Sequence, residues 1–112
     1  MVAIVDTLLA ELLRAVKGMG VDFDSLDIIL VEAELSDLES DSPHPDPQRG
    51  LGIALAYAGR GKSVIIVGER EYSDFDVWHS LFLNPNVAFC PKPITSEGFN
   101  RALKKIMPEA NI

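Results

Sequence analysis

The chain has 112 residues, the size of a single domain, and 47% of them are hydrophobic while 24% are charged. This composition is too apolar for an intrinsically disordered protein. The formal net charge of −7 excludes the Lys and Arg excess that non-specific nucleic-acid binding requires. The one cysteine, Cys90, excludes an internal disulfide and a multi-cysteine zinc site.

The sequence predicts neither a membrane-spanning segment nor an export signal. Its apolar runs fall far short of the ~20 residues that span a bilayer, and no basic stretch precedes an apolar run at its start. His44 and His79 each stand without a second His or Cys at ligand spacing, so we expect no metal site and no cofactor. We predict a cytoplasmic protein that binds neither membrane nor nucleic acid.

The first segment of the chain has two interpretations. Either Val2–Val5 is a strand and Thr7–Lys17 the helix after it, or Val2–Lys17 is one amphipathic helix, because its apolar residues recur with a helical period. We favour the strand, because a sheet of three strands is thin for a domain of this size.

Residues 22–48 are first acidic and then rich in proline. Nine acidic residues and no Lys or Arg lie between residues 22 and 46, so this stretch forms either a solvated surface or a carboxylate cluster for a cation or a basic partner. Three prolines among turn-forming residues predict a loop over residues 36–48. This loop interrupts a single domain, residues 1–112, since neither flank is long enough to fold alone.

Strand and helix patterns alternate along the rest of the chain. The predicted strands are aliphatic runs at Asp27–Ala33, Ser63–Gly68 and Val87–Cys90, and the predicted helices are Gly50–Gly59, Asp74–Leu83 and Thr95–Met107. This alternation predicts an α/β fold: an open parallel sheet of about four strands in consecutive order, with helices on its faces.

The predicted order of the strands has a consequence for the helices. Parallel crossovers are right-handed in ~98% of cases, so consecutive strands place the first three helices on one face. Thr95–Met107 alone would then cover the other face, leaving an apolar patch. We therefore expect a homodimer or a protein partner that covers this face or the edge of the Val2–Val5 strand.

Polar residues follow the predicted strands at their carboxyl ends, where ligands bind in such sheets. These residues are Asp6, Thr7, Glu32, Gly68 and Lys92. They are consistent with a cation or phosphate site, or with a structural Glu–Lys pair.

Four motifs, VAIVDT, DIILVEAEL, SVIIVGE and VAFCPKPIT, resemble those of the response-regulator receiver domain in order and spacing. The resemblance implies a flavodoxin-like fold and assigns Lys92 to the family lysine and Phe89 to the aromatic switch position. Glu32 stands where the family has its phosphoacceptor Asp, and Gly68 stands where it has Thr or Ser. Of the family's acidic pair for Mg²⁺, only Asp6 is present.

These departures each weaken phosphoryl transfer. The interval between Lys17 and Asp27 is also too short for the strand–helix unit that receivers insert there. We therefore expect a non-enzymatic, phosphorylation-independent receiver-like module for signalling through protein partners, with no catalytic residue. The alternative is a small-molecule or nucleotide-binding module that uses the crevice at the strand ends; acid–base catalysis there is disfavoured because the residues include no nucleophile.

Overall fold

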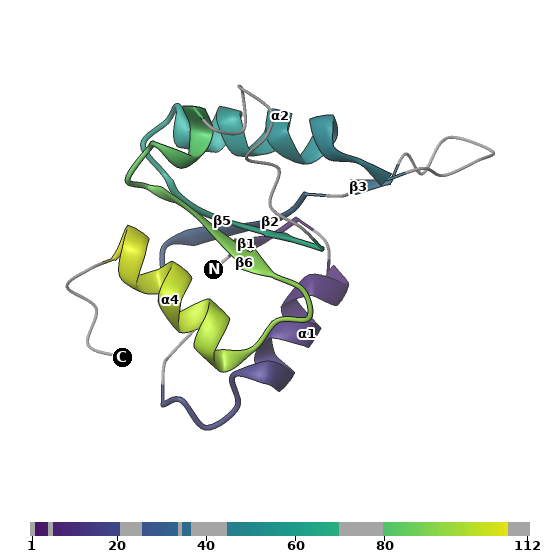
Figure 1. Ribbon diagram of the computed structural model, residues 1–112, viewed down its shortest axis with the longest axis vertical. Coiled ribbons are helices and arrows are strands. Elements are labelled where there is room, and N and C mark those ends of the chain that lie inside the picture. Colours follow the sequence, from purple (N-terminus) through teal and green to yellow (C-terminus); the bar gives the residue numbers. More distant parts are fainter. Residues whose placement is uncertain are drawn as a thin grey trace.

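The computed structural model describes residues 2–4, 6–20, 26–33, 35–36, 45–69 and 80–107. Their centre is an open sheet of four parallel strands in the order β1-β2-β5-β6, with helices on both faces (Figure 1). The strands are β1 (Val2–Ala3), β2 (Ile28–Glu32), β5 (Ser63–Gly68) and β6 (Val87–Pro91); the helices are α1 (Asp6–Ala15), α2 (Pro47–Ala58) and α4 (Ser96–Ile106). The α/β fold, the flavodoxin-like arrangement and the consecutive strand order are thus confirmed.

The N-terminal segment forms a strand and then a helix. β1 ends at Ala3 and α1 begins at Asp6, so the single helix over Val2–Lys17 is wrong. β1 is shorter than the predicted Val2–Val5 and, among the described strands, is an edge strand that pairs with β2.

The two central strands are buried on both faces. Residues 28–31 of β2 and 64–67 of β5 have side chains at most 6% exposed. Aliphatic and β-branched side chains fill both faces of these strands, as expected where helices cover a parallel sheet on each side.

The structure shows regular elements at both ends of the loop predicted over residues 36–48. β3 (Leu35–Ser36) pairs antiparallel with β4 (Pro45–Asp46), and α2 begins directly afterwards at Pro47. Proline suits the first position of a helix because a backbone N–H at that position would have no partner within the helix. Residues 37–44 lie outside the described part of the chain.

The predicted helix Asp74–Leu83 falls mainly on residues 70–79, which lie outside the described residues. Residues 80–82 are helical, and Leu81 packs into the same apolar cluster as Ala54 and Ala58 of α2.

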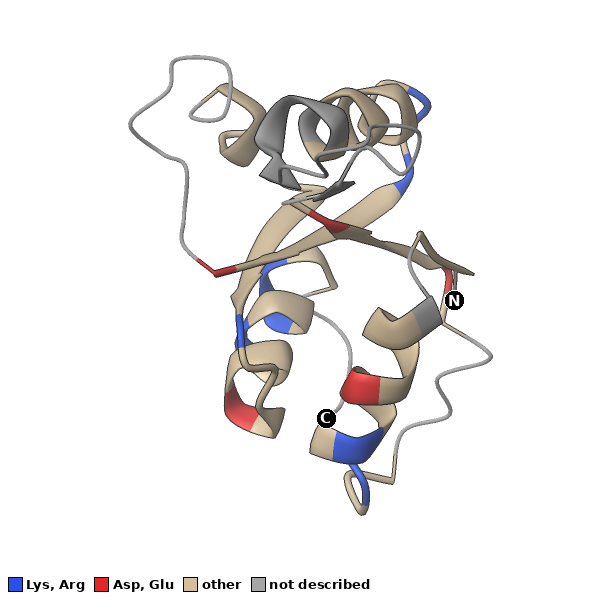
Figure 2. Ribbon diagram, turned by 90° about the vertical axis from the view of Figure 1, so that its right-hand side faces the viewer, with Lys and Arg blue, Asp and Glu red and all other residues tan. Residues whose placement is uncertain are grey.

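The predicted distribution of the helices over the two faces is wrong. Leu8 and Leu12 of α1 pack in one cluster with Phe99 and Leu103 of α4, so these two helices share a face (Figures 1 and 2). α2 lies on the opposite face. Because both crossovers run in the same direction along the sheet, the one through α1 has the opposite hand to the one through α2.

Burial explains this departure from the handedness rule. α4 is ~10 Å wide, whereas four strands span about 19 Å, so α4 alone would leave half a face uncovered. α1 covers that half with a stripe formed by Leu8, Leu12 and Val16. Gly18 and Gly20, whose φ values of 93° and 74° suit glycine, redirect the chain just after the helix.

Candidate functional site

Three of the predicted site residues meet at the carboxyl ends of adjacent strands. Glu32 is the last residue of β2, Gly68 is the last residue of β5, and Lys92 directly follows β6. The Lys92 backbone N–H donates to the Gly68 carbonyl over 2.8 Å, which continues the β5–β6 ladder beyond the last paired residue.

An ion pair joins two of these side chains. The Lys92 Nζ donates a hydrogen bond to Glu32 Oε1, and the two side chains are only 22% and 20% exposed. Because β5 lies between β2 and β6, the lysine side chain must cross the end of β5 to reach Glu32. The structure therefore realises the Glu–Lys pair that the sequence left open as one of its interpretations.

The other two predicted pocket residues lie on α1. Asp6 is the first residue of this helix, but its side chain lies outside the described part of the structure. The Thr7 side chain is exposed, and no described interaction joins it to the Glu32–Lys92 pair. The structure thus connects Glu32, Gly68 and Lys92, while Asp6 and Thr7 stay predictions as pocket residues.

Helix α2 approaches the end of β2 more closely than a side chain would allow. A Cβ atom added at Gly50 would lie 2.6 Å from the Glu32 carbonyl oxygen, 2.7 Å from the Ala33 carbonyl oxygen and 2.8 Å from the Ala33 Cα. These contacts are with backbone, which cannot move aside cheaply. The predicted crevice is therefore bordered by the ion pair and, on the α2 side, by direct contact between helix and strand.

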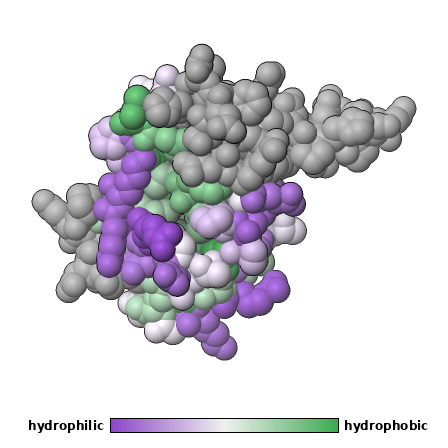
Figure 3. All heavy atoms as spheres, viewed as in Figure 1, coloured by the Kyte–Doolittle hydropathy of each residue, from purple (hydrophilic) through white to green (hydrophobic). Residues whose placement is uncertain are grey.

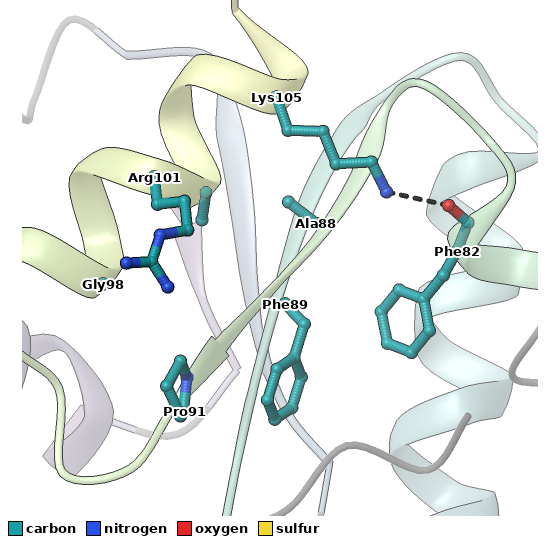
Figure 4. A pocket seen from close by; sticks show the side chains of 8 residues that line it. Phe82, Ala88, Phe89, Pro91, Gly98, Arg101 and Lys105 are labelled. Atoms are coloured by element: carbon teal, nitrogen blue, oxygen red, sulfur yellow. Dashed lines mark hydrogen bonds between the residues drawn. The ribbon is translucent and has the colours of Figure 1, made fainter. Parts of the chain in front are cut away.

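Phe89 lies on β6 three residues before Lys92, and it packs against the apolar cluster on the α2 side of the sheet. Its half-buried ring packs edge-to-face against Phe82, with ring centroids 6.0 Å apart and an angle of 81° between the rings. The two aromatic rings border a groove at the edge of the sheet (Figure 4).

This groove is a feature that the sequence analysis missed. It has a volume of about 440 Å³ and lies between β6, α4 and the helical residues 80–82; its lining residues are Phe82, Ala88, Phe89, Pro91, Gly98, Arg101, Ala102 and Lys105. The Lys105 Nζ reaches across it and donates to the Phe82 carbonyl over 2.8 Å (Figure 4). The sequence shows two lysines near the end of the last predicted helix. Which of them lies near Phe82 depends on how this helix packs against the sheet, and the sequence does not show that.

Cys90 faces the opposite side of β6 from Phe89 and is fully buried. Burial, and secondarily the negative charge of Glu11, raise the pKa of the Cys90 thiol from 9.0 to about 11. The thiol is therefore neutral near pH 7 and is a poor nucleophile.

The described residues form an ion pair at the strand ends and an amphipathic groove beside β6. They include no cluster of three or more His, Cys, Asp or Glu residues placed to hold a metal ion. Among these residues, no helix combines the length and the hydropathy needed to cross a membrane. Comparison of the chain with protein-family models, with curated proteins and with solved structures found no match.

Proposed function

We propose that this chain is a phosphorylation-independent, receiver-like signalling module that works by binding a protein partner. The ion pair between Lys92 and Glu32 is the observation that carries this proposal. In the receiver resemblance, Glu32 occupies the phosphoacceptor position and Lys92 that of the conserved lysine. A carboxylate already held by the lysine at this position supplies the charge that a phosphoryl group would bring.

The neighbouring residues support the same proposal. Gly68 has no hydroxyl group to hold a phosphoryl oxygen, and its carbonyl is already bonded to the Lys92 backbone. Gly50 brings α2 into contact with the Glu32 and Ala33 backbone, which limits the room for a ligand at the strand ends. The crevice alternative therefore has less support than partner binding.

The groove beside β6 offers a surface for such a partner. It combines apolar and aromatic side chains with the cations of Arg101 and Lys105, and a mixture of aromatic residues and Arg is typical of protein interfaces. A cytoplasmic location is the matching proposal for the compartment, supported by a single cysteine that is buried and neutral.

Incubation with acetyl phosphate and Mg²⁺, followed by intact-mass measurement, tests the absence of phosphorylation. We expect no added phosphoryl group on this chain, while a receiver domain with an intact acceptor Asp, treated in parallel, gains one. An adduct that hydroxylamine removes would identify an acyl phosphate and overturn the proposal.

A thermal-shift series addresses the crevice alternative. Mg²⁺ and nucleotides are expected to leave the melting temperature unchanged. A ligand present at 100 times its Kd would stabilise the fold by ~2.7 kcal/mol, which such a measurement detects. Stabilisation that disappears in Lys92→Met would favour a ligand site at the strand ends.

A further inference from the structure

The helix α1 lies on one half of an apolar face, beside α4. α1 contacts β1 and β2, whereas α4 contacts β5 and β6, and the two helices share one apolar cluster (Figures 1 and 2). Leu8, Leu12 and Val16 of α1 are buried at intervals of four residues, so the surface beneath them fits one amphipathic helix. On this face of the molecule, Figure 3 shows pale and green apolar surface beside hydrophilic side chains.

Hydrogen-bond acceptors interrupt the contact between α1 and α4. The Asn100 Oδ1 atom is buried and has no hydrogen-bond partner among the described residues. The β6 groove lies along one flank of α4, and Asn100 lies on the other flank, which faces α1. Glu11 of α1 reaches toward the same place, because its negative charge, after burial, raises the pKa of the Cys90 thiol on β6. A buried acceptor without a donor weakens the packing of the two helices.

The connection between α1 and the rest of the sheet is also unfavourable. The crossover through α1 has the opposite hand to the one through α2, although ~98% of parallel crossovers are right-handed. Gly20 follows α1 with a φ of 74°, and an added Cβ at this position would meet nothing within 4 Å. Burial of the apolar stripe therefore holds α1 in place, and a second helix with such a stripe can supply the same burial.

We propose that the α1 seat, the apolar face of β1, β2 and α4 that α1 covers, binds a basic amphipathic helix of a partner protein in place of α1. Three apolar side chains of this helix, four residues apart, take the places of Leu8, Leu12 and Val16. A lysine in the place of Glu11 donates to Asn100 Oδ1, and its charge suits a chain whose net charge is −7. The inference rests on the proposed partner-binding function and names the surface and the chemistry of the partner.

Fluorescence polarisation with a labelled helical peptide tests this assignment. The probe has the sequence of residues 6–17 with Glu11→Lys. One control peptide keeps Glu11, and the other carries Leu12→Ser in addition to Glu11→Lys. At 0.5 M salt, which screens attraction to net charge, we expect the full-length chain to bind the probe, to bind the Glu11 peptide about fivefold more weakly, and not to bind the Leu12→Ser peptide.

Two glycine substitutions in the full-length chain locate the binding site. Gly20→Ala strains the turn after α1, whereas Gly61→Ala strains a turn of similar φ, 78°, between α2 and β5. Neither added Cβ meets an atom within 4 Å, so each substitution acts through the backbone conformation alone. Release of α1 relieves the strain at residue 20 but not at residue 61. We expect Gly20→Ala to bind the probe about fivefold more tightly than the wild type, and Gly61→Ala to change the affinity by less than about twofold.

Four results would overturn the assignment. Neither the wild type nor Gly20→Ala binds the probe, or the Leu12→Ser peptide binds as well as the probe, which indicates attraction to charge alone. Equal binding of the probe and the Glu11 peptide would show that Asn100 accepts no hydrogen bond from the lysine. Equal tightening by both glycine variants would show that the peptide binds the unfolded chain rather than the α1 seat. None of these results alters the phosphorylation assay, so failure here is distinguishable from failure of the proposed function.

Discussion

At the residue scale, we predict that the Lys92–Glu32 ion pair stabilises the fold. Lys92→Met removes the cation and leaves a carboxylate that is four-fifths buried. Exposed pairs contribute under ~1 kcal/mol, whereas breaking a buried pair costs ~3–5 kcal/mol, so we expect the free energy of unfolding to fall by about 1–3 kcal/mol. Urea denaturation at neutral pH measures this change.

Lys62→Met is the matched control for that variant. Lys62 pairs with Asp27 at 4.0 Å, with side chains 48% and 86% exposed, so its loss is expected to cost less than ~1 kcal/mol. Equal effects of the two substitutions would mean that Lys92 is solvated and that the strand-end pair contributes nothing particular.

The raised pKa of Cys90 predicts that the free energy of unfolding depends on pH above neutrality. The ordinary pKa of a cysteine thiol is 9.0, and burial and then Glu11 raise the pKa of Cys90 to about 11 in the folded chain. Between these values the unfolded state loses a proton that the folded state retains, so the free energy of unfolding falls as pH rises from about 9 to about 11. Urea denaturation across this range is expected to show a steeper fall for the wild type than for Cys90→Ala. Parallel curves would contradict the assignment.

Some site residues were predictable from the sequence because they depend only on strand ends. Glu32 and Lys92 each follow an aliphatic run, and parallel strands end at one edge of a sheet. The roles of Gly50 and Arg101 were not predictable, because they depend on where a helix crosses a strand and on which side of a helix meets the sheet edge. Neither quantity can be read from a local pattern.

At the scale of elements, the contact of α2 with β2 predicts opposite effects at two glycines of one helix. An added Cβ at Gly50 would overlap the backbone of residues 32 and 33, whereas one at Gly52 meets nothing within 4 Å. Gly50→Ala is expected to destabilise the fold by about 1–3 kcal/mol, the cost of overpacking. Gly52→Ala is expected to stabilise it by about 0.5–1 kcal/mol, because alanine loses less entropy in a helix.

Chemical denaturation of the two glycine variants beside the wild type checks this pair of outcomes. A neutral Gly50→Ala would mean that α2 shifts away from β2 at little cost, and the close approach would then not constrain the strand-end site.

The elements themselves were more predictable than their arrangement. β5 has the predicted bounds, since a β-branched run buried on both faces is distinctive. α4 also follows its pattern, because Thr95 accepts a hydrogen bond from the Gly98 N–H as its N-cap. The face occupied by α1 was predicted wrongly, because the handedness rule competes with burial of a whole apolar face, and burial prevailed here.

At the scale of the whole molecule, the position of α1 removes the argument for a homodimer. The face that α4 was expected to cover alone is covered by both helices. The large hydrophobic side chains that are exposed among the described residues, Val2, Leu13, Leu55 and Leu83, belong to different elements. Exposed apolar residues of this scattered kind are ordinary on a monomer.

We therefore expect light scattering at micromolar concentration to give the mass of one chain, 12.2 kDa. A mass near twice that value would restore the homodimer, with the groove or the β1 edge as its interface. In that case Arg101→Gln, which alters the groove, would dissociate the dimer only if the groove is the interface.

The two-residue length of β1 also has a consequence for how the native protein opens. β1 joins the sheet through two paired residues and the Ile4 N–H bond to Leu30, whereas β2 and β5 pair over five. The N-terminal strand and α1 should therefore detach at a lower free energy than the rest of the domain unfolds. Cys90 lies in the apolar cluster that α1 helps to cover. The rate at which Cys90 reacts with a thiol reagent therefore measures how often this part of the domain opens.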